Sequence, residues 1–253
     1  MARTFSLVTW NCRGIKQAGR REDLFYHCSR LQTDMIILQE TNIQTPRERS
    51  QAQKAWTWGP SLWSLKLDQG AGGIGLLFKH DRDIRIITIV DASPGHLFLV
   101  DFDLTFPNGA PPHKYRLVTL YAPVDRRERR ALWETMKDHL NTHRALIVAG
   151  DFNVRSEAED RIAWGPQGRH ATKTLSAEEK KLKELLRGQC NLNDAALDTV
   201  CSLDFLPTHH RVFYQSKFEG FSGSKMTYYH PRAVSRIDRV WCPPSLCPDK
   251  TDF

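Results

Sequence analysis

Polar residues suited to metal and phosphate chemistry follow or close four apolar runs of this chain. They lie in Thr-Trp-Asn-Cys-Arg-Gly at 9–14, Leu-Gln-Glu-Thr at 38–41, Gly-Asp-Phe-Asn at 150–153 and Ser-Arg-Ile-Asp-Arg at 235–239. The carboxylates and amides of these segments supply hard oxygen atoms, which Mg²⁺ prefers as ligands. Four such segments at the ends of predicted strands therefore indicate a site for a divalent cation and a phosphate group.

Glu40 and Asn11 are the first two candidates. Glu40 closes an apolar run, where a lone carboxylate is costly unless it is paired or bound to a metal. It is therefore the predicted metal ligand, and the alternative is an exposed glutamate after a strand. Asn11 is predicted to bind a metal-bound water or a phosphate oxygen, and the alternative is a turn-forming asparagine before Arg13.

Asp151, Asn153 and Tyr121 complete the candidates that the residues themselves suggest. Asp151 and Asn153 are two positions apart, so in extended backbone both side chains point the same way. They are predicted to orient the attacking water and to hold a phosphate oxygen, with an Asx turn as the alternative. Tyr121 is predicted to donate its hydroxyl to the phosphate, with plain packing as the alternative.

Basic residues exceed acidic ones by 36 to 29, which gives a formal net charge of +7. A basic surface around an acidic site favours a polyanionic partner, although solubility alone would also explain the charge. The cations Arg126, Arg127, Arg129 and Arg130 begin a predicted helix, where they oppose its dipole. A bound phosphate would relieve that conflict, and the alternative is a solvated helix face.

The chain shows no secretory signal region and no apolar run of about 20 residues, so no membrane partner is expected. The six cysteines contain no Cys-x-x-Cys pair, which argues against a zinc site. A reducing cytosolic or nuclear setting is therefore expected.

Apolar patterning predicts strands and helices in a mixed order. The predicted strands span 5–10, 35–39, 74–78, 84–90, 96–104, 115–121 and 145–149, and the predicted helices span 20–31 and follow Asp125 and Ser176. A glycine-rich segment at 70–73 reads as a turn rather than a phosphate-binding loop. Consecutive strands between alternating strands and helices favour an α/β fold with two packed sheets and helices outside.

These segments, with Leu-Tyr-Ala-Pro at 120–123 and Met-Thr-Tyr-Tyr at 226–229, resemble the endonuclease/exonuclease/phosphatase superfamily. Within it, the chain is most similar to the apurinic-endonuclease-like domain of LINE-type (non-LTR) retrotransposons, of which the Ser-Arg-Ile-Asp-Arg form is typical. The resemblance implies a four-layer, DNase I-like α/β sandwich of two mixed β-sheets flanked by helices. It also implies one endonuclease domain over 1–253 and dependence on Mg²⁺, with Mn²⁺ as the alternative ion.

The resemblance further implies an enzyme that nicks double-stranded DNA in the nucleus. The resulting 3′-hydroxyl would prime reverse transcription by the reverse transcriptase domain of the same element. An abasic-site repair endonuclease is the alternative within the enzymes, and a catalytically compromised DNA-binding module is the alternative outside them. Arg13, Thr227, Ser235 and Arg236 are the further expected DNA contacts. The segment 209–224 is expected to be either a hairpin near DNA or a core strand.

Asp238 resembles the family aspartate that orients a catalytic histidine in a later Ser-Asp-His segment. No such segment precedes Phe253, and His209, His210 and His230 come before Asp238. The expectation from this departure is a domain that lacks its last strand and has reduced activity.

Overall fold

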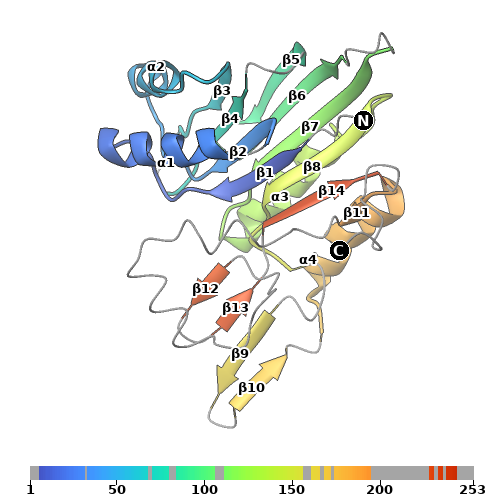
Figure 1. Ribbon diagram of the computed structural model, residues 1–253. Coiled ribbons are helices and arrows are strands. Elements are labelled where there is room, and N and C mark those ends of the chain that lie inside the picture. Colours follow the sequence, from blue (N-terminus) through green and yellow to red (C-terminus); the bar gives the residue numbers. More distant parts are fainter. Residues whose placement is uncertain are drawn as a thin grey trace. The chain divides into compact units, whose positions relative to one another are not determined.

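The computed structural model describes most of the N-terminal two thirds of the chain and short segments beyond it (Figure 1). The described residues are 6–31, 33–67, 70–79, 84–105, 111–155, 161–165, 168–171, 174–194, 228–230, 233–235 and 238–243. The chain forms two compact units. The first contains 1–153, 184–195 and 238–253, and the second contains 154–183 and 196–237.

Two mixed β-sheets form the first unit. The four-stranded sheet has the order β1-β2-β4-β3, with β1 at Leu7–Asn11, β2 at Met35–Gln39, β4 at Ile74–Phe78 and β3 at Ser61–Ser64. The six-stranded sheet has the order β11-β14-β8-β7-β6-β5. Its strands are β11 at Asn193–Asp194, β14 at Asp238–Cys242, β8 at Ala145–Asp151, β7 at His113–Tyr121, β6 at Leu97–Leu104 and β5 at Ile84–Ser93. In each sheet one pair of strands is parallel, β1 with β2 and β7 with β8, and the others are antiparallel.

The hydrophobic core lies between these sheets. Met35 and Ile37 from the smaller sheet share one buried cluster with Phe102, Leu117 and Ile147 from the larger sheet. Every residue of β2 is buried, as expected for an apolar run covered on both faces.

Helices cover the outer faces of the sheets. Phe25 of α1 (Ala18–Arg30) lies 5.6 Å from Trp56, which follows α2 (Pro46–Ala55), and 6.3 Å from Trp63 of β3. Trp133 of α3 (Arg126–Lys137) stacks on Phe152 at 6.2 Å. The predicted fold class, two mixed sheets flanked by helices, is confirmed. Among the described residues, no helix has the length and apolar character needed to cross a membrane.

The capping predictions had different outcomes. Ser176 and Glu179 form the predicted capping box, each side chain accepting from the other residue's backbone N–H. Asp125 caps α3 by accepting from the N–H groups of Arg127 and Glu128. Helix α2 was not predicted, although Thr45 and Glu48 carry a capping-box signature and form the complete box.

The second unit contains a small sheet that the sequence analysis did not anticipate. Its order is β10-β9-β13-β12, with β9 at Arg161–Gly165, β10 at Gly168–Ala171, β12 at Tyr228–His230 and β13 at Ala233–Ser235. Helix α4 (Ala177–Lys183) belongs to this unit, and the π-helix η2 (Glu184–Gln189) belongs to the first. The single domain over 1–253 therefore stays a prediction. Thr227, Arg236 and the predicted hairpin at 209–224 lie outside the described residues.

Candidate functional site

The carboxyl ends of four strands bring the candidate residues to one edge of the first unit. Asn11 ends β1, and Glu40 directly follows β2, which runs parallel to β1. Tyr121 ends β7 and lies opposite Asp151 at the end of the parallel strand β8. We call Asn11, Glu40, Tyr121, Asp151 and Asn153 the strand-end cluster.

One hydrogen bond joins the two sheets within this cluster. The amide Nδ2 of Asn11, in the smaller sheet, donates to Oδ2 of Asp151, in the larger sheet, at 2.9 Å. The backbone N–H of Asn153 donates to the other carboxylate oxygen of Asp151, also at 2.9 Å. Both oxygens of Asp151 are therefore oriented, and each keeps a lone pair for a water or a proton.

Asp151 is 2% exposed, and this burial shapes its acidity. The pKa of its carboxyl is raised from 3.8 to about 6, mainly by burial. The hydrogen bonds from Asn11 and Asn153 act in the opposite direction and lower this pKa. The charge of Glu40 raises this pKa further, and the charge of Arg13 lowers it. A carboxylate with a pKa of about 6 is ionised at neutral pH and is a stronger base than an ordinary aspartate, which suits proton abstraction from water.

Tyr121 is a neutral hydrogen-bond donor. It is 5% exposed, and its burial, followed by the negative charges of Glu40 and Asp151, raises the pKa of its phenol far above the usual value. The hydroxyl therefore keeps its proton at any physiological pH. Such a group suits donation to a phosphate oxygen.

The extended geometry expected for Asp151 and Asn153 is wrong. Strand β8 ends at Asp151, and Asn153 has a left-handed backbone with φ of 48°. Its N–H turns back to the Asp151 carboxylate, as in an Asx turn, because aspartate readily binds the backbone two residues later. The Asn153 amide also donates to the carbonyl oxygen of Ala122 at 2.6 Å, which ties the end of β8 to the segment after β7.

Asn11 forms the turn that was the alternative reading, and its predicted contact with a metal-bound water or a phosphate oxygen stays a prediction. Its Oδ1 accepts from the N–H of Arg13 at 3.1 Å, as in a turn, while its Nδ2 binds Asp151. Arg13 itself is exposed. Asp238 begins β14 directly opposite Asp151 in the antiparallel register, and its proposed role with a histidine stays a prediction.

Unusual backbone conformations gather at the same edge. Five described non-glycine residues have a positive φ, and four of them, Arg13, Glu40, Asn42 and Asn153, lie just after β1, β2 or β8. Such conformations are uncommon outside glycine and occur preferentially at functional sites. Their concentration here supports a site at the strand ends.

Gly150 allows β7 and β8 to approach beside Asp151. Its φ is 141°, and a Cβ added to it would lie 2.0 Å from the carbonyl oxygen of Leu120. We expect Gly150→Ala to destabilise the protein by about 3 kcal/mol or more, since the clash is with backbone in a buried strand pair. Thermal and urea unfolding would measure the loss.

Gly19→Ala is the matched control for this prediction. Apart from its chain neighbours and the backbone of α1 itself, no atom lies within 4 Å of a Cβ at this position, which is exposed in α1. The control should be neutral or stabilising by up to about 1 kcal/mol. If Gly150→Ala and Gly19→Ala had the same free energy of unfolding, the close approach of β7 and β8 would be refuted.

The arginine run at the start of α3 divides into two kinds of residue. Arg126, Arg127 and Arg130 are exposed. Arg129 is half-buried, and its Nη1 donates to the carbonyl oxygens of Pro123 and Val124 at 3.1 and 2.6 Å. Arg129 therefore holds the segment between Tyr121 and α3, a role that its position in the run did not reveal.

Sequence reasoning missed His96, which contacts Tyr121. Its Nδ1 lies 2.8 Å from the Tyr121 carbonyl oxygen, and the two rings stack with centroids 5.9 Å apart. A histidine after a Pro-Gly turn was visible in the sequence, but only the pairing of β6 with β7 brings it to Tyr121.

The glycine-rich segment at 70–73 is a turn. The N–H of Gly72 donates to Oδ1 of Asn42, and the N–H of Gly73 donates to the carbonyl oxygen of Gly95. Because these donors bind the protein itself, the segment does not cradle a phosphate with them.

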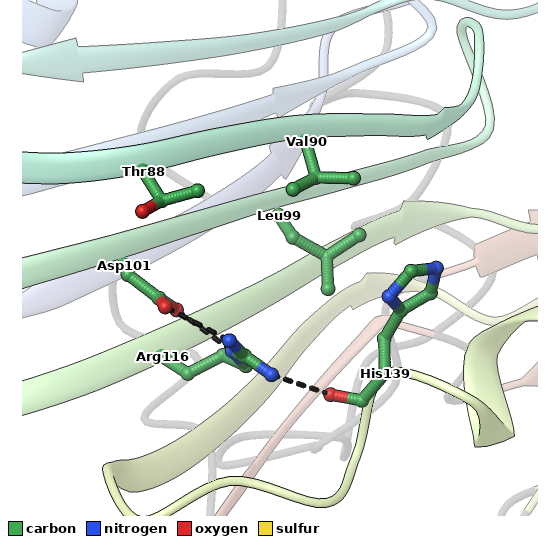
Figure 2. A pocket seen from close by; sticks show the side chains of 6 residues that line it. All are labelled: Thr88, Val90, Leu99, Asp101, Arg116 and His139. Atoms are coloured by element: carbon green, nitrogen blue, oxygen red, sulfur yellow. Dashed lines mark hydrogen bonds and ion pairs between the residues drawn. The ribbon is translucent and has the colours of Figure 1, made fainter.

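A shallow pocket on the six-stranded sheet is a separate feature (Figure 2). Figure 2 shows the Arg116 guanidinium between Asp101 and the His139 carbonyl oxygen. Arg116 binds both oxygens of Asp101, at 2.7 and 2.8 Å, and donates to His139 at 3.2 Å. These paired charges link the chain after α3 to the sheet, which is a structural role.

The strand-end cluster fits a divalent cation. Glu40 and Asp151 are carboxylates whose charges disfavour each other, as the pKa of Asp151 shows. A divalent cation would relieve this repulsion, and Mg²⁺ commonly takes one or two carboxylates together with waters and substrate phosphates. Over the described part of the chain, no group of three or more His, Cys, Asp or Glu side chains is arranged to hold a metal.

The endonuclease/exonuclease/phosphatase family matches residues 8–252, and the chain belongs to this family. Enzymes of this family generally use divalent metal ions.

Two related sequences give a more specific comparison. An exodeoxyribonuclease of Bacillus subtilis (strain 168) is 23% identical over 167 residues, which cover 61% of this chain and 60% of the relative. The transposon TX1 149 kDa protein of Xenopus laevis, itself described as uncharacterized, is 24% identical over 186 residues. These cover 72% of this chain and 13% of that protein. The chain thus spans less than two thirds of either relative.

Solved structures share the fold at low identity. An AP endonuclease from Leishmania major has a TM-score of 0.60 at 15% identity, covering 95% of this chain and 79% of that one. A 3′ phosphatase from Neisseria bound to a product DNA hairpin has a TM-score of 0.57 at 16% identity, covering 96% and 88%.

Proposed function

We propose that this chain is a Mg²⁺-dependent endonuclease that nicks double-stranded DNA and leaves a 3′-hydroxyl for target-primed reverse transcription. The observation that carries the proposal is the oriented, buried Asp151 carboxylate, held by Asn11 and Asn153 beside Glu40 and Tyr121. The match to a transposon protein of which this chain covers 13% supports the retrotransposon setting. In that setting the partner is the reverse transcriptase domain of the same element, and the site of action is the nucleus.

The residues of the cluster divide the hydrolysis between them. Asp151 takes a proton from the attacking water, while Asn11 and Asn153 keep its carboxylate in one orientation. Tyr121 donates its hydroxyl to a non-bridging phosphate oxygen, where negative charge grows in the transition state. Glu40, with Asp151 nearby, would hold the divalent ion, which when bound supplies charge stabilisation to the phosphate and the leaving oxygen.

A plasmid assay tests the proposal. Purified protein is incubated with supercoiled plasmid, with Mg²⁺, with Mn²⁺ or with EDTA, and open-circle product is quantified. The nicked product is then extended by a DNA polymerase without further treatment, which requires a 3′-hydroxyl. Metal-dependent nicks that support extension are expected. Intact plasmid with both metals at micromolar protein would refute the proposal.

An abasic-site endonuclease is the second candidate, because the chain shares its fold with an AP endonuclease from Leishmania major. The same assay on plasmid carrying abasic sites separates the two. Preferential cleavage of the intact plasmid, or equal cleavage of the two plasmids, supports the retrotransposon function. Cleavage confined to abasic plasmid supports repair.

The exposed arginines at the start of α3 should set the salt dependence of DNA binding. In Arg127→Gln/Arg130→Gln, each phosphate contact that is lost should lower the slope of log K against log salt by about 0.9. Fluorescence anisotropy with a duplex at several salt concentrations measures the slope. Two lost contacts would give a total decrease of about 1.8.

Lys114→Gln/Lys137→Gln is the charge-matched control. Both lysines are exposed at the opposite end of the six-stranded sheet from Tyr121, near the start of β7 and the end of α3. This variant should keep the wild-type slope. Equal slopes for the wild type and the arginine variant would instead assign the run to a solvated face.

A further inference from the structure

The turn between β5 and β6 holds Tyr121 through three contacts from one residue. The N–H of Tyr121 donates to the His96 carbonyl oxygen at 3.0 Å, and His96 Nδ1 lies 2.8 Å from the Tyr121 carbonyl oxygen. The two aromatic rings lie within 18° of parallel, with centroids 5.9 Å apart. These distances fall in the range of favourable aromatic pairs.

The chemistry of the Nδ1 contact defines the state of the His96 ring. A backbone carbonyl oxygen only accepts hydrogen bonds, so Nδ1 must carry the proton. The contact therefore exists in both the neutral and the charged imidazole. It fixes the orientation of the ring and, through stacking, the plane of the Tyr121 phenol.

The same turn also supports the strand end that carries Glu40. The carbonyl oxygen of Gly95 accepts from the N–H of Gly73, and the Gly73 carbonyl oxygen accepts from the N–H of Thr41. Gly95 has φ of 74°, and an added Cβ would lie 2.9 Å from Cα of Lys66. The turn therefore packs closely against the backbone at Lys66. Adjacent residues 95 and 96 thus connect to Glu40 in one sheet and Tyr121 in the other.

We propose that His96 is a positioning residue that sets the Tyr121 hydroxyl relative to Glu40 across the two sheets. The inference rests on the proposed function for its catalytic consequence. Burial of Tyr121, and after it the charges of Glu40 and Asp151, raise the pKa of its phenol, so the hydroxyl lies near both carboxylates of the cluster. Displacing such a group by about 1 Å costs on the order of 10²-fold in rate.

Three substitutions separate the contacts of His96. His96→Ala removes the ring and the Nδ1 hydrogen bond, and kcat for plasmid nicking should fall by about 10- to 100-fold with KM little changed. His96→Asn keeps an amide donor near the Nδ1 position, and His96→Phe keeps the stacked ring, so each should recover part of the loss. His113→Ala is the control, because His113 stacks on Tyr115 in the same manner at the other end of β7.

A double variant tests whether His96 acts through Tyr121. If it does, His96→Ala should cost much less in a Tyr121→Phe background than in the wild type. The same fold-loss in both backgrounds would overturn the proposal, as would a wild-type kcat for His96→Ala.

A measurement without DNA keeps the inference separate from the activity. In ¹³C-tyrosine-labelled protein, the Tyr121 ring signal is the one that Tyr121→Phe removes. That signal should shift in His96→Ala and stay in place in His113→Ala. A wild type that fails to nick plasmid would refute the proposed function, whereas an unmoved Tyr121 signal would refute the positioning role.

Discussion

Replacement of Asp151 by asparagine should strongly reduce nicking and at the same time raise thermal stability at neutral pH. Nicking should fall by about 10²–10⁴-fold, because an amide does not accept the proton of the attacking water. DNA binding should persist, since the lost negative charge repels phosphate.

The stability gain follows from the acidity of the buried carboxyl. The native pKa of Asp151 is about 6 against 3.8 for an ordinary aspartate, so between these values the native state binds more protons than the unfolded state. Stability therefore falls as pH rises through this window. The two-unit difference corresponds to about 3 kcal/mol at pH 7.5.

Asparagine does not ionise, so the variant avoids the free-energy cost of burying a charged carboxylate. The new amide loses the hydrogen bond from Asn11, which reduces this gain in stability by about 1 kcal/mol. The remaining gain of about 1–2 kcal/mol should raise Tm by several degrees in a chain of this size. Calorimetry in EDTA at pH 7.5 and at pH 4.5 measures the effect, and the advantage should disappear at the lower pH.

Asp23→Asn is the control for Asp151→Asn, since Asp23 is exposed on α1. It should change neither nicking nor Tm. An Asp151→Asn protein that nicks at the wild-type rate would remove Asp151 from the mechanism. One that is less stable at pH 7.5 would show that the hydrogen bond from Asn11 outweighs the cost of burying the charge.

The wild-type nicking rate should depend on pH through the protonation of the Asp151 carboxyl. Nicking should decline as pH falls through about 6, where Asp151 becomes protonated in the metal-free protein. Bound cation would move this acid limb lower, because a positive charge favours the carboxylate. The limb should therefore shift to lower pH as the metal concentration rises.

Glu40→Gln should produce the second large loss, of about 10²–10⁴-fold in nicking at low millimolar Mg²⁺. The substitution keeps the shape of the side chain and removes one of two carboxylates that favour a divalent ion, a loss of charge stabilisation comparable to removing a catalytic group. High metal concentration should restore part of the rate, because the defect lies in metal affinity.

Binding of Mn²⁺, followed by electron paramagnetic resonance without DNA, measures that affinity directly. Glu40→Gln should weaken it by at least about tenfold, whereas Glu22→Gln, on the exposed face of α1, should leave it unchanged. Removing the Glu40 charge should also lower the pKa of Asp151, since that charge raises it. Unaltered Mn²⁺ affinity would exclude Glu40 as the ligand.

The sequence by itself determined many strands of the two larger sheets, several helix starts and the polar residues at the strand ends, but not α2 or the small sheet of the second unit. The apolar run at 35–39 predicted a doubly covered strand, and Ser176 with Glu179 predicted a helix start, because burial patterns and caps act over a few neighbouring residues. Polar residues at the ends of parallel strands were likewise visible, and such ends meet at one edge of a sheet.

Only the tertiary structure decided how those residues meet. The hydrogen bond from Asn11 to Asp151 joins positions 140 residues apart, and it exists because two different sheets pack face to face. The approach of His96 to Tyr121 depends on the register of β6 with β7. The bond from the Asn153 amide to the Ala122 carbonyl oxygen depends on the pairing of β7 with β8. Such contacts arise from sheet packing and strand pairing, which no local pattern of residues encodes.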